Sequence, residues 1–205
     1  EYYKSYSSPV YTCFLDLSKA FDRINHWVLC DKLLKRNIPV MIVRIIQRWY
    51  STQSFIVKWG ASLGTPFCVT NGVRQGGILS PYLFNVIVDD LSVLLNSAKV
   101  GCYMNGISYN HLIYADDTVI LAPSPSSLQM LITKCEEFAK DHELVFNPRK
   151  TKCMCFKPRS MADISFPMVF IDNVEIEQVD EISYLGVLLT EDYLHDKTID
   201  KERKL

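Results

Sequence analysis

The sequence has no long apolar run and almost no net charge. No apolar stretch approaches the roughly 20 residues needed to cross a bilayer, and the first residues lack the basic-then-apolar pattern of an export signal. We therefore expect an intracellular protein, in the nucleus or the cytoplasm, with no membrane partner. The formal net charge of -1 gives no indication of a nucleic-acid partner.

Cysteine spacing excludes the usual zinc motifs. The seven cysteines are an odd number and contain no Cys-x-x-Cys pair, while Cys153 and Cys155 alternate as buried strand residues do. We expect reduced thiols and no zinc site.

The composition is that of a globular protein. With 205 residues, 48% of them apolar and 22% charged, the chain can form one domain with a substantial core, or one domain and part of another. A basic cluster at residues 149–159 precedes an acidic one at residues 172–181. Solvated faces explain these clusters as well as binding surfaces do.

Asp116 and Asp117 form the most informative stretch. They lie between the apolar runs at residues 112–114 and 119–122, a pattern that predicts two strands joined by a tight acidic turn. Adjacent carboxylates raise each other's proton affinity unless a cation lies between them. A hydrated surface turn is the alternative, because Asp is common in turns.

A second acid ends a predicted buried strand. Residues 10–17 are rich in β-branched and aromatic residues, and an acid at Asp16 is costly there unless it has a partner. The order of the predicted elements indicates an α+β fold, a mostly antiparallel sheet with helices packed on one face. In such a sheet, Asp16 can lie beside Asp116 and Asp117.

Periodicity and turn signals predict the other elements. Ile42, Ile45, Ile46 and Trp49 give one helix an apolar stripe, with Arg44 and Arg48 on another face. The expected elements are helices at 26–36, 40–50, 80–96 and 124–142, hairpins at 55–69, 102–109 and 169–179, and strands at 151–156 and 182–189.

Converging carboxylates without His or Cys favour hard cations, above all Mg²⁺. Magnesium keeps waters and accepts substrate phosphate oxygens as its remaining ligands, so a phosphorylated substrate is expected. Paired ions of this kind serve in-line displacement at phosphorus.

Several segments together resemble reverse transcriptases of non-LTR retrotransposons of the long interspersed element type. They occur in the order of that family's motifs, and the resemblance covers roughly residues 10–190. The segments are Phe14-Leu15-Asp16-Leu17-Ser18-Lys19-Ala20-Phe21-Asp22, Gly72-Val73-Arg74-Gln75-Gly76 with Ser80-Pro81, Tyr114-Ala115-Asp116-Asp117, Asn147-Pro148-Arg149-Lys150-Thr151 and Tyr184-Leu185-Gly186.

The resemblance implies a polymerase palm with a metal site. Asp16, Asp116 and Asp117 would be catalytic and would hold two Mg²⁺ ions, for which Mn²⁺ can substitute, and the Leu17 carbonyl oxygen would add a ligand. Phe21 matches the steric gate that favours dNTPs over ribonucleotides. A core phenylalanine is the alternative for Phe21.

The resemblance also implies residues around the nucleotide and the primer. Lys19, Ala20 and Phe21 would line the nucleotide, with Gln75 and Gly76 contacting it and the template base. For Gln75 and Gly76, an ordinary loop before a helix is the alternative. Gly77 departs from relatives that carry a larger residue. Lys150 would act on departing pyrophosphate, with Arg149 and Lys152 as adjacent competitors and a plain surface lysine as the alternative. Tyr184, Leu185 and Gly186 match the primer grip, whose alternative is a strand that closes the core.

The resemblance predicts a palm with incomplete fingers at residues 1–190 and a polar tail at 191–205, where a thumb would start. Only fifteen residues precede Asp16, where the family places a fingers region. We expect other domains of a larger polyprotein to supply the missing basic surface.

The expected function is RNA-directed DNA polymerisation, with an RNA template, a DNA primer and dNTPs as partners. One alternative is an inactive palm kept as a scaffold or nucleic-acid-binding module. Another is a two-metal phosphotransferase such as a nucleotide cyclase, which Phe21 and the Gln75-Gly76 loop disfavour.

Overall fold

The strand predicted at residues 10–17 lies at the centre of a sheet. A computed structural model describes residues 2–158 and 166–191. Their contacts divide these described residues into two units. Unit 1 takes those within Glu1–Leu17, Ser92–Glu137 and Phe146–Leu205, and unit 2 takes Ser18–Leu91 and Phe138–Val145. Each unit is described by itself.

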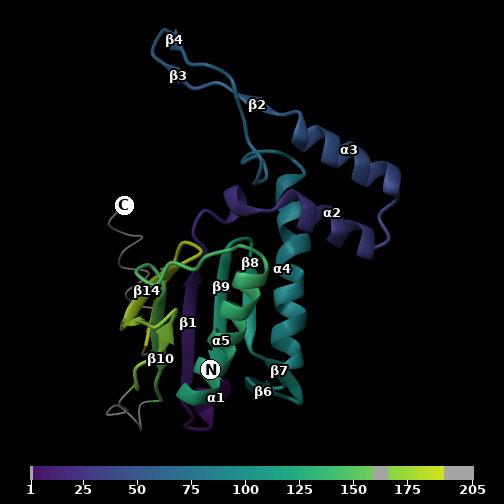
Figure 1. The fold of residues 1–205 in the computed structure, drawn as a ribbon. Coiled ribbons are helices and arrows are strands. Elements are labelled where there is room, and N and C mark those ends of the chain that lie inside the picture. Colours follow the sequence, from purple (N-terminus) through teal and green to yellow (C-terminus); the bar gives the residue numbers. More distant parts are fainter. Residues whose placement is uncertain (1, 159–165, 192–205) are drawn as a thin grey trace. The chain divides into compact units, whose positions relative to one another are not determined.

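Unit 1 is built on a five-stranded sheet (Figure 1). Its central strand is β1 (Val10–Asp16), which pairs antiparallel with β9 on one side and with β10 on the other. The strand order is β13 (Glu177–Gln178), β10 (Lys152–Phe156), β1, β9 (Asp117–Ala122) and β8 (His111–Tyr114). Only the β10 and β13 pairing among these is parallel, so the predicted mostly antiparallel sheet is confirmed.

Different elements pack on the two faces of this sheet. Cys13 is fully buried on one face, against Cys135 of α5 (Pro125–Asp141). Phe14 lies on the other face, in a cluster with Val119 and Met154 against which partly buried apolar residues of the last hairpin pack. The predicted α+β fold is confirmed: α5 covers one face, where helices were expected, and a hairpin covers part of the opposite face.

That last hairpin corrects the prediction of a single strand at residues 182–189. The structure has β14 (Glu181–Tyr184) paired antiparallel with β15 (Val187–Thr190). Leu185 and Gly186 form the turn, with φ values of 48° and 80°. A leucine rarely adopts this left-handed backbone, so the apolar alternation concealed the turn.

Two further hairpins of unit 1 turn where the sequence predicted. Asn105 and Gly106 join β6 (Cys102–Met104) to β7 (Ile107–Tyr109), and Asp172 and Asn173 join β11 (Phe170–Ile171) to β12 (Val174–Glu175). All four turn residues have positive φ, which Asn, Asp and Gly tolerate best. A short helix, α1 (Tyr2–Ser5), precedes β1.

Unit 2 contains two predicted helices after a single 3-10 turn, η1 (Ala20–Arg23). In α2 (His26–Lys35), the Asn25 side chain caps the first turn by accepting from the Trp27 and Val28 amides. In α3 (Val40–Ser51), the buried side chains are Val43, Ile46 and Tyr50.

The apolar stripe predicted for α3 is therefore only partly the buried one. Ile46 is buried, but Ile42, Ile45 and Trp49 are exposed. Periodicity alone could not identify the buried face, because the helix carries apolar residues on most of its circumference.

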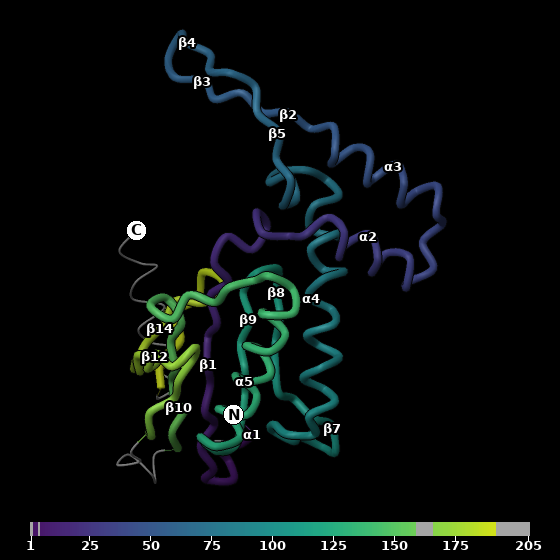
Figure 2. The backbone as a smooth tube through the Cα atoms, viewed as in Figure 1, coloured from purple at the N-terminus to yellow at the C-terminus, as the bar shows by residue number. Residues whose placement is uncertain are grey.

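The predicted hairpin at residues 55–69 is a long arm with two short ladders. β2 (Ser54–Phe55) pairs with β5 (Phe67–Cys68), and β3 (Lys58–Trp59) pairs with β4 (Ser62–Leu63) further along. Figure 2 shows this arm following α3 along the chain.

The long helix α4 (Ser80–Ser97) begins in unit 2 and ends in unit 1, because the boundary between the units falls after Leu91. Phe84, Leu91 and Leu95 are fully buried, as expected for a central helix. Over the described part of the chain, no helix is long and apolar enough to cross a membrane. All seven cysteines are free. The predicted tail lies outside the described residues from position 192 onward.

Candidate active site

The acidic ends of two sequence-distant strands meet in unit 1. Asp16 is the last residue of β1 and Asp117 is the first residue of β9. The antiparallel register pairs them directly, in step with Phe14 opposite Val119. Because directly paired residues lie on the same face of a sheet, both carboxylates belong to the Phe14 face. The predicted convergence of Asp16 with the acidic hairpin is present in the backbone.

Asp116 lies in the turn just before Asp117. β8 ends at Tyr114, which pairs with Asp117, so Ala115 and Asp116 form a two-residue turn. Ala115 has φ 53°, a left-handed conformation that costs an L-residue roughly 1–2 kcal/mol. Such strain is characteristic of sites where function fixes the backbone. Asp116 and Asp117 are both exposed.

A separate segment holds the backbone of Asp16 in place. The Asn147 amide donates to the Asp16 carbonyl at 2.8 Å, and the Asp16 amide donates to Thr151 Oγ1 at 3.2 Å. Leu17 forms an isolated antiparallel bridge with Phe146. Thr151 is completely buried. The sequence analysis singled out Lys150 in this segment and missed the supporting role of Thr151. The position of Thr151 at the start of the strand predicted at 151–156 could have suggested this role.

Negative charge accumulates where these acids meet. Burial, and then the charges of Asp116 and Asp16, raise the pKa of the Asp117 carboxyl. A divalent cation between the carboxylates would remove this repulsion, so the residues fit such an ion. Among the described residues, no group of three or more His, Cys, Asp or Glu side chains is arranged to hold a metal ion by itself.

Tyr184 lies on the same face as the acids. Its ring contacts that of Phe14 edge to face, with centroids 5.6 Å apart. Burial, and next the charge of Asp117, raise the pKa of the Tyr184 hydroxyl. The structure thus brings Tyr184 near the carboxylates, while Leu185 and Gly186 are exposed at the hairpin turn.

The three basic residues near position 150 differ in their contacts. Lys152 forms an ion pair with Glu177, which leaves it less available for a ligand. Lys150 and Arg149 are exposed in the turn that begins at Asn147. The structure therefore favours these two over Lys152 as groups for an anionic ligand.

The predicted nucleotide residues near position 20 belong to unit 2. Lys19 has φ 51° and leads into η1, where Ala20 is buried. The ring of Phe21 is half-buried and stacks on that of Phe84, with centroids 4.7 Å apart and planes 19° apart. Phe21 therefore combines a packed face with some accessible surface.

The glycine-rich loop lies against this same segment. The Gly72 amide donates to the Ile24 carbonyl and the Val73 amide to the Phe21 carbonyl, each at 2.7 Å. A Cβ on Gly72 would come within 2.8 Å of the Asp22 carbonyl oxygen, so only glycine allows this approach.

The loop then presents its polar residues to solvent. Gln75 is exposed and donates to Asp22 Oδ1 at 3.3 Å. Gly76 has open space where a Cβ would be. The structure thus brings Gln75 together with the Phe21 segment, and Asp22 is a contact that the sequence did not predict.

The chain matches the family model described as reverse transcriptase (RNA-dependent DNA polymerase) over residues 2–189. It is 30% identical over 186 residues to the Pol polyprotein of the type-2 retrotransposable element R2DM of Drosophila melanogaster. It is 29% identical over 187 residues to that of the type-1 element R2 of Nasonia vitripennis. These matches cover 88% and 87% of this chain, but only 18% of each relative.

Solved structures show the same fold. A telomerase from Candida tropicalis, in complex with a fragment of telomeric RNA, has a TM-score of 0.63 at 14% identity, covering 90% of this chain and 29% of the telomerase. The apo form of a truncated Candida tropicalis telomerase has a TM-score of 0.61 at 15% identity, over 89% and 34%. The predicted polymerase palm is therefore confirmed as a fold, and the chain belongs to the reverse transcriptase (RNA-dependent DNA polymerase) family.

Proposed function

We propose that this chain is the palm of a retrotransposon RNA-directed DNA polymerase, which transfers dNMP from a dNTP to a primer 3′-hydroxyl. The observation that carries the proposal is the pairing of Asp16 with Asp117 across β1 and β9, with Asp116 in the adjacent turn. A family member with this pairing intact retains the acids that the chemistry needs, which disfavours an inactive scaffold.

Asp16, Asp116 and Asp117 would hold two Mg²⁺ ions, or Mn²⁺ in their place, with the Leu17 carbonyl as a further ligand. When bound, the ions supply charge neutralisation for the attacking and leaving oxygens. The raised pKa of Asp117 supports this assignment, because uncompensated carboxylates favour a cation.

The other residues would position the reactants. Phe21 would close the space of a ribose 2′-hydroxyl, Lys19 and Ala20 would line the nucleotide, and Gln75 with Gly76 would contact it. The primer 3′-hydroxyl gives up its proton to solvent as its oxygen bonds to the α-phosphorus, and the bond to pyrophosphate breaks. Lys150, exposed beside the segment that holds Asp16, would neutralise or protonate the pyrophosphate.

The primer end would rest on the turn of the β14–β15 hairpin. Tyr184 packs on Phe14 of β1, the same strand that ends at Asp16, so the hairpin is anchored to the catalytic strand. Leu185 and Gly186 are exposed at its tip, where a primer can reach them.

The RNA template, the primer and the full activity would involve a longer polyprotein. The chain spans about a fifth of the length of the curated relatives that it matches. Further segments of such a polyprotein would supply basic surface for the nucleic acids, since this chain has a net charge of -1.

Primer extension by the polyprotein that carries this chain tests the proposal. We expect Mg²⁺-dependent incorporation of dNTPs on an RNA template, and a loss of at least about 100-fold in Asp116→Asn. Glu175→Gln, an exposed acid in β12, is the matched control and should extend normally. RNA binding without any incorporation by the unmodified protein would instead indicate a scaffold.

A further inference from the structure

His26 joins two segments of unit 2 that are far apart in the sequence. It is the first residue of α2, and its Nε2 lies 2.7 Å from the carbonyl oxygen of Gly72. A carbonyl oxygen only accepts hydrogen bonds, so Nε2 carries the hydrogen and donates it. The bond therefore ties α2 to the start of the glycine-rich loop at residues 72–79, which ends where α4 begins.

The Gly72 peptide is held from two sides. Its amide donates to the Ile24 carbonyl at 2.7 Å, while its carbonyl accepts from His26. The next amide, that of Val73, donates to the Phe21 carbonyl. Of these three bonds, only the one from His26 comes from a side chain, so a substitution can remove it without changing the backbone.

The same ring contacts the residue that holds the other end of the loop. The His26 ring packs on that of Tyr50, the centroids lying 4.7 Å apart. Burial raises the pKa of the Tyr50 hydroxyl, and hydrogen bonds with the Ser80 side chain and the Arg74 backbone partly oppose this. The Ser80 hydroxyl in turn donates to the Arg74 carbonyl. His26 and Tyr50 together therefore hold the loop at both of its ends.

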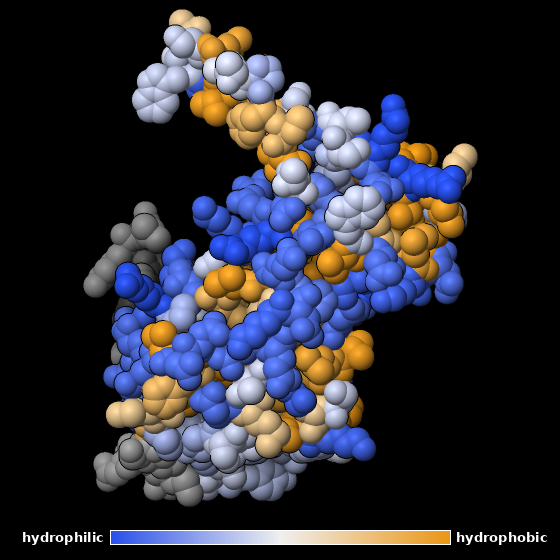
Figure 3. All heavy atoms as spheres, viewed as in Figure 1, coloured by the Kyte–Doolittle hydropathy of each residue, from blue (hydrophilic) through white to orange (hydrophobic). Residues whose placement is uncertain are grey.

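The last turn of α3 makes this attachment. Val40, Met41 and Ile45 are each more than half exposed, and Figure 3 shows apolar side chains on the surface over the first part of this helix. Tyr50, in the last turn, is only 3% exposed. The helix thus meets the loop through Tyr50 and not through its exposed apolar side chains.

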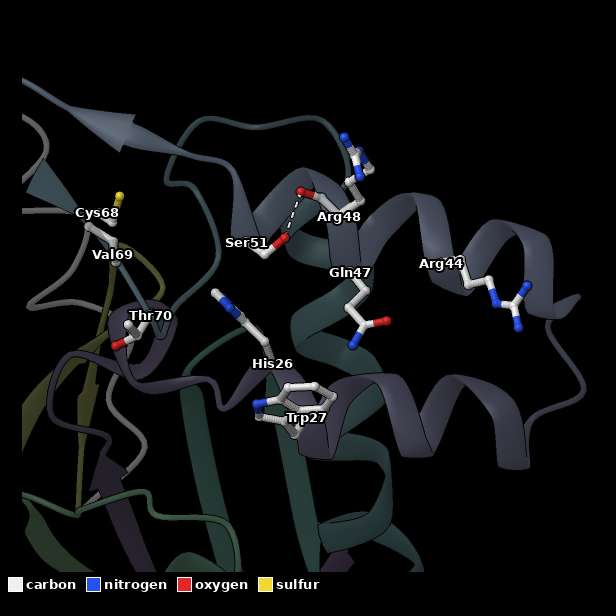
Figure 4. A pocket seen from close by; sticks show the side chains of 9 residues that line it. All are labelled: His26, Trp27, Arg44, Gln47, Arg48, Ser51, Cys68, Val69 and Thr70. Atoms are coloured by element: carbon white, nitrogen blue, oxygen red, sulfur yellow. Dashed lines mark hydrogen bonds between the residues drawn. The ribbon is translucent and has the colours of Figure 1, made fainter.

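Part of the His26 ring faces open space. His26 lines a cavity of about 710 Å³, and Figure 4 shows its ring pointing away from Trp27, into the space between Ser51 and Thr70. The first turn of α2 does not need the ring, because the Asn25 side chain caps it. Another ring of similar size therefore fits at position 26, so the bond to Gly72 can be removed while the packing is kept.

The loop presents Gln75 and Gly76 between its two attachments. Gln75 is exposed, and nothing lies within 4 Å of a Cβ built on Gly76. The Gly77 amide donates to the Arg74 carbonyl at 3.0 Å and closes the turn behind them. A loop that is already ordered by its ends loses less conformational entropy when a ligand binds.

We propose that His26 is a positioning residue for polymerisation, because its bond to Gly72 holds the loop in the conformation in which Gln75 and Gly76 meet the nucleotide. The inference rests on the proposed function, in which these two residues contact the dNTP. His26 itself would touch neither the nucleotide nor the metal ions. Losing preorganisation of this kind weakens ground-state and transition-state binding alike, which raises KM for the dNTP and leaves kcat unchanged.

Two substitutions separate the bond from the ring. His26→Phe keeps an aromatic ring against Tyr50 and removes the donor, while His26→Gln keeps an N–H donor and removes the ring. His142→Phe is the matched control, because His142 is also half-buried in unit 2 and stacks on Phe138, with centroids 4.0 Å apart. Its Nδ1 bonds to the Phe138 carbonyl at 2.8 Å, four residues away, so this bond joins no distant segment.

Steady-state primer extension by the polyprotein that carries this chain gives the first readout. We expect His26→Phe to raise KM for the dNTP about 5- to 30-fold with kcat within about 2-fold. His26→Gln and His142→Phe should keep KM within about 3-fold of the unmodified value. A merely structural role would reduce the active fraction, and so lower kcat at an unchanged KM.

Three kinetic results would overturn the inference. One is an unchanged KM in His26→Phe, and another is an equal rise in His142→Phe. The third is a rise in His26→Gln as large as that in His26→Phe, because it would assign the effect to the ring and not to the bond.

Hydrogen exchange of the full chain gives a second readout that needs neither metal nor dNTP. The amides of Gly72, Val73 and Gly77, all hydrogen-bonded, should exchange at least about 5-fold faster in His26→Phe and at the unmodified rate in His142→Phe. Equal exchange in both variants would overturn the inference. Absence of dNTP incorporation by the unmodified polyprotein would contradict the proposed function, and the exchange rates would then decide by themselves whether His26 holds the loop.

Discussion

Asp16 and Asp117 lie directly opposite each other at the same end of the paired strands β1 and β9. A slip of one residue in this register would move one carboxylate to the other face of the sheet. The acidic pair therefore depends on the buried residues that fix the register, such as Phe14 opposite Val119 and the fully buried Cys13 opposite Ile120.

Removing the Asp117 charge should change how stability depends on pH. Burial and the neighbouring acids raise the pKa of Asp117 above 3.8, so the folded chain binds this proton more tightly than the unfolded chain does. Its contribution to stability is therefore fully present below 3.8 and is lost as the pH rises through the raised value. In metal-free buffer, Asp117→Asn should raise the free energy of unfolding at neutral pH by up to about 0.5 kcal/mol.

Urea unfolding at about pH 4 and about pH 7 measures this difference. Added Mg²⁺ should stabilise the unmodified chain more than Asp117→Asn, because a ligand of the native state stabilises it by mass action. A variant that is less stable than the unmodified chain at neutral pH would contradict the proposed repulsion.

Thr151 should act as a positioning residue for Asp16. Thr151→Val removes the acceptor of the Asp16 amide and should cost roughly 1–3 kcal/mol of stability. Thr12→Val is the matched control, because Thr12 of β1 is also a fully buried threonine and donates to the Met154 carbonyl at 2.8 Å. At equal folded fraction, primer extension should fall in Thr151→Val only. An equal loss in both variants would reduce Thr151 to a core residue.

Gly72 and Gly76 should differ in their tolerance of a methyl group. Both have positive φ, 91° and 78°, but only Gly72 has backbone atoms of Asp22 within 3.0 Å of a built Cβ. Gly76→Ala should therefore cost about 1 kcal/mol from backbone strain, and Gly72→Ala roughly 1–3 kcal/mol more. Denaturant midpoints of the two variants test this order. Equal midpoints would show that the loop does not hold this close contact.

Phe21 should control the choice of sugar. Phe21→Val removes the ring that stacks on Phe84 and opens space beside Ala20, so ribonucleotide incorporation should rise about 10-fold or more relative to dNTPs. Single-nucleotide extension with each substrate measures the ratio. An unchanged ratio, with dNTP incorporation intact, would make Phe21 a packing residue, the alternative that its stacking on Phe84 also allows.

Local signals in the sequence predicted much of the fold. The run of β-branched and aromatic residues ended at Asp16, and Asn105-Gly106 and Asp172-Asn173 marked hairpins. These features succeed because turn chemistry and periodicity act within a few residues. The pairing of Asp16 with the acidic hairpin followed from the α+β order and from the family resemblance together.

The misses have a common physical cause. The side of α3 that is buried depends on the elements that pack against it. Val43 and Tyr50 are buried, whereas Ile42 and Trp49 are exposed. The turn at Leu185 and Gly186 places a leucine in a backbone conformation that leucine disfavours, so the glycine alone did not reveal it within an apolar run. The support of Asp16 by Thr151 and the contact of Gln75 with Asp22 join distant segments, which local patterns do not reveal.

Cleavage mapping with Fe²⁺ in place of Mg²⁺ tests whether Asp16 and the acidic hairpin bind the same divalent ion, since bound Fe²⁺ with ascorbate and peroxide cuts the backbone near the ion. We expect cuts near both Asp16 and Asp116, suppressed by excess Mg²⁺ and lost in Asp16→Asn and in Asp117→Asn but not in Glu175→Gln. Cuts near only one of the two segments, or cuts that persist in both variants, would show that these acids do not share a divalent ion.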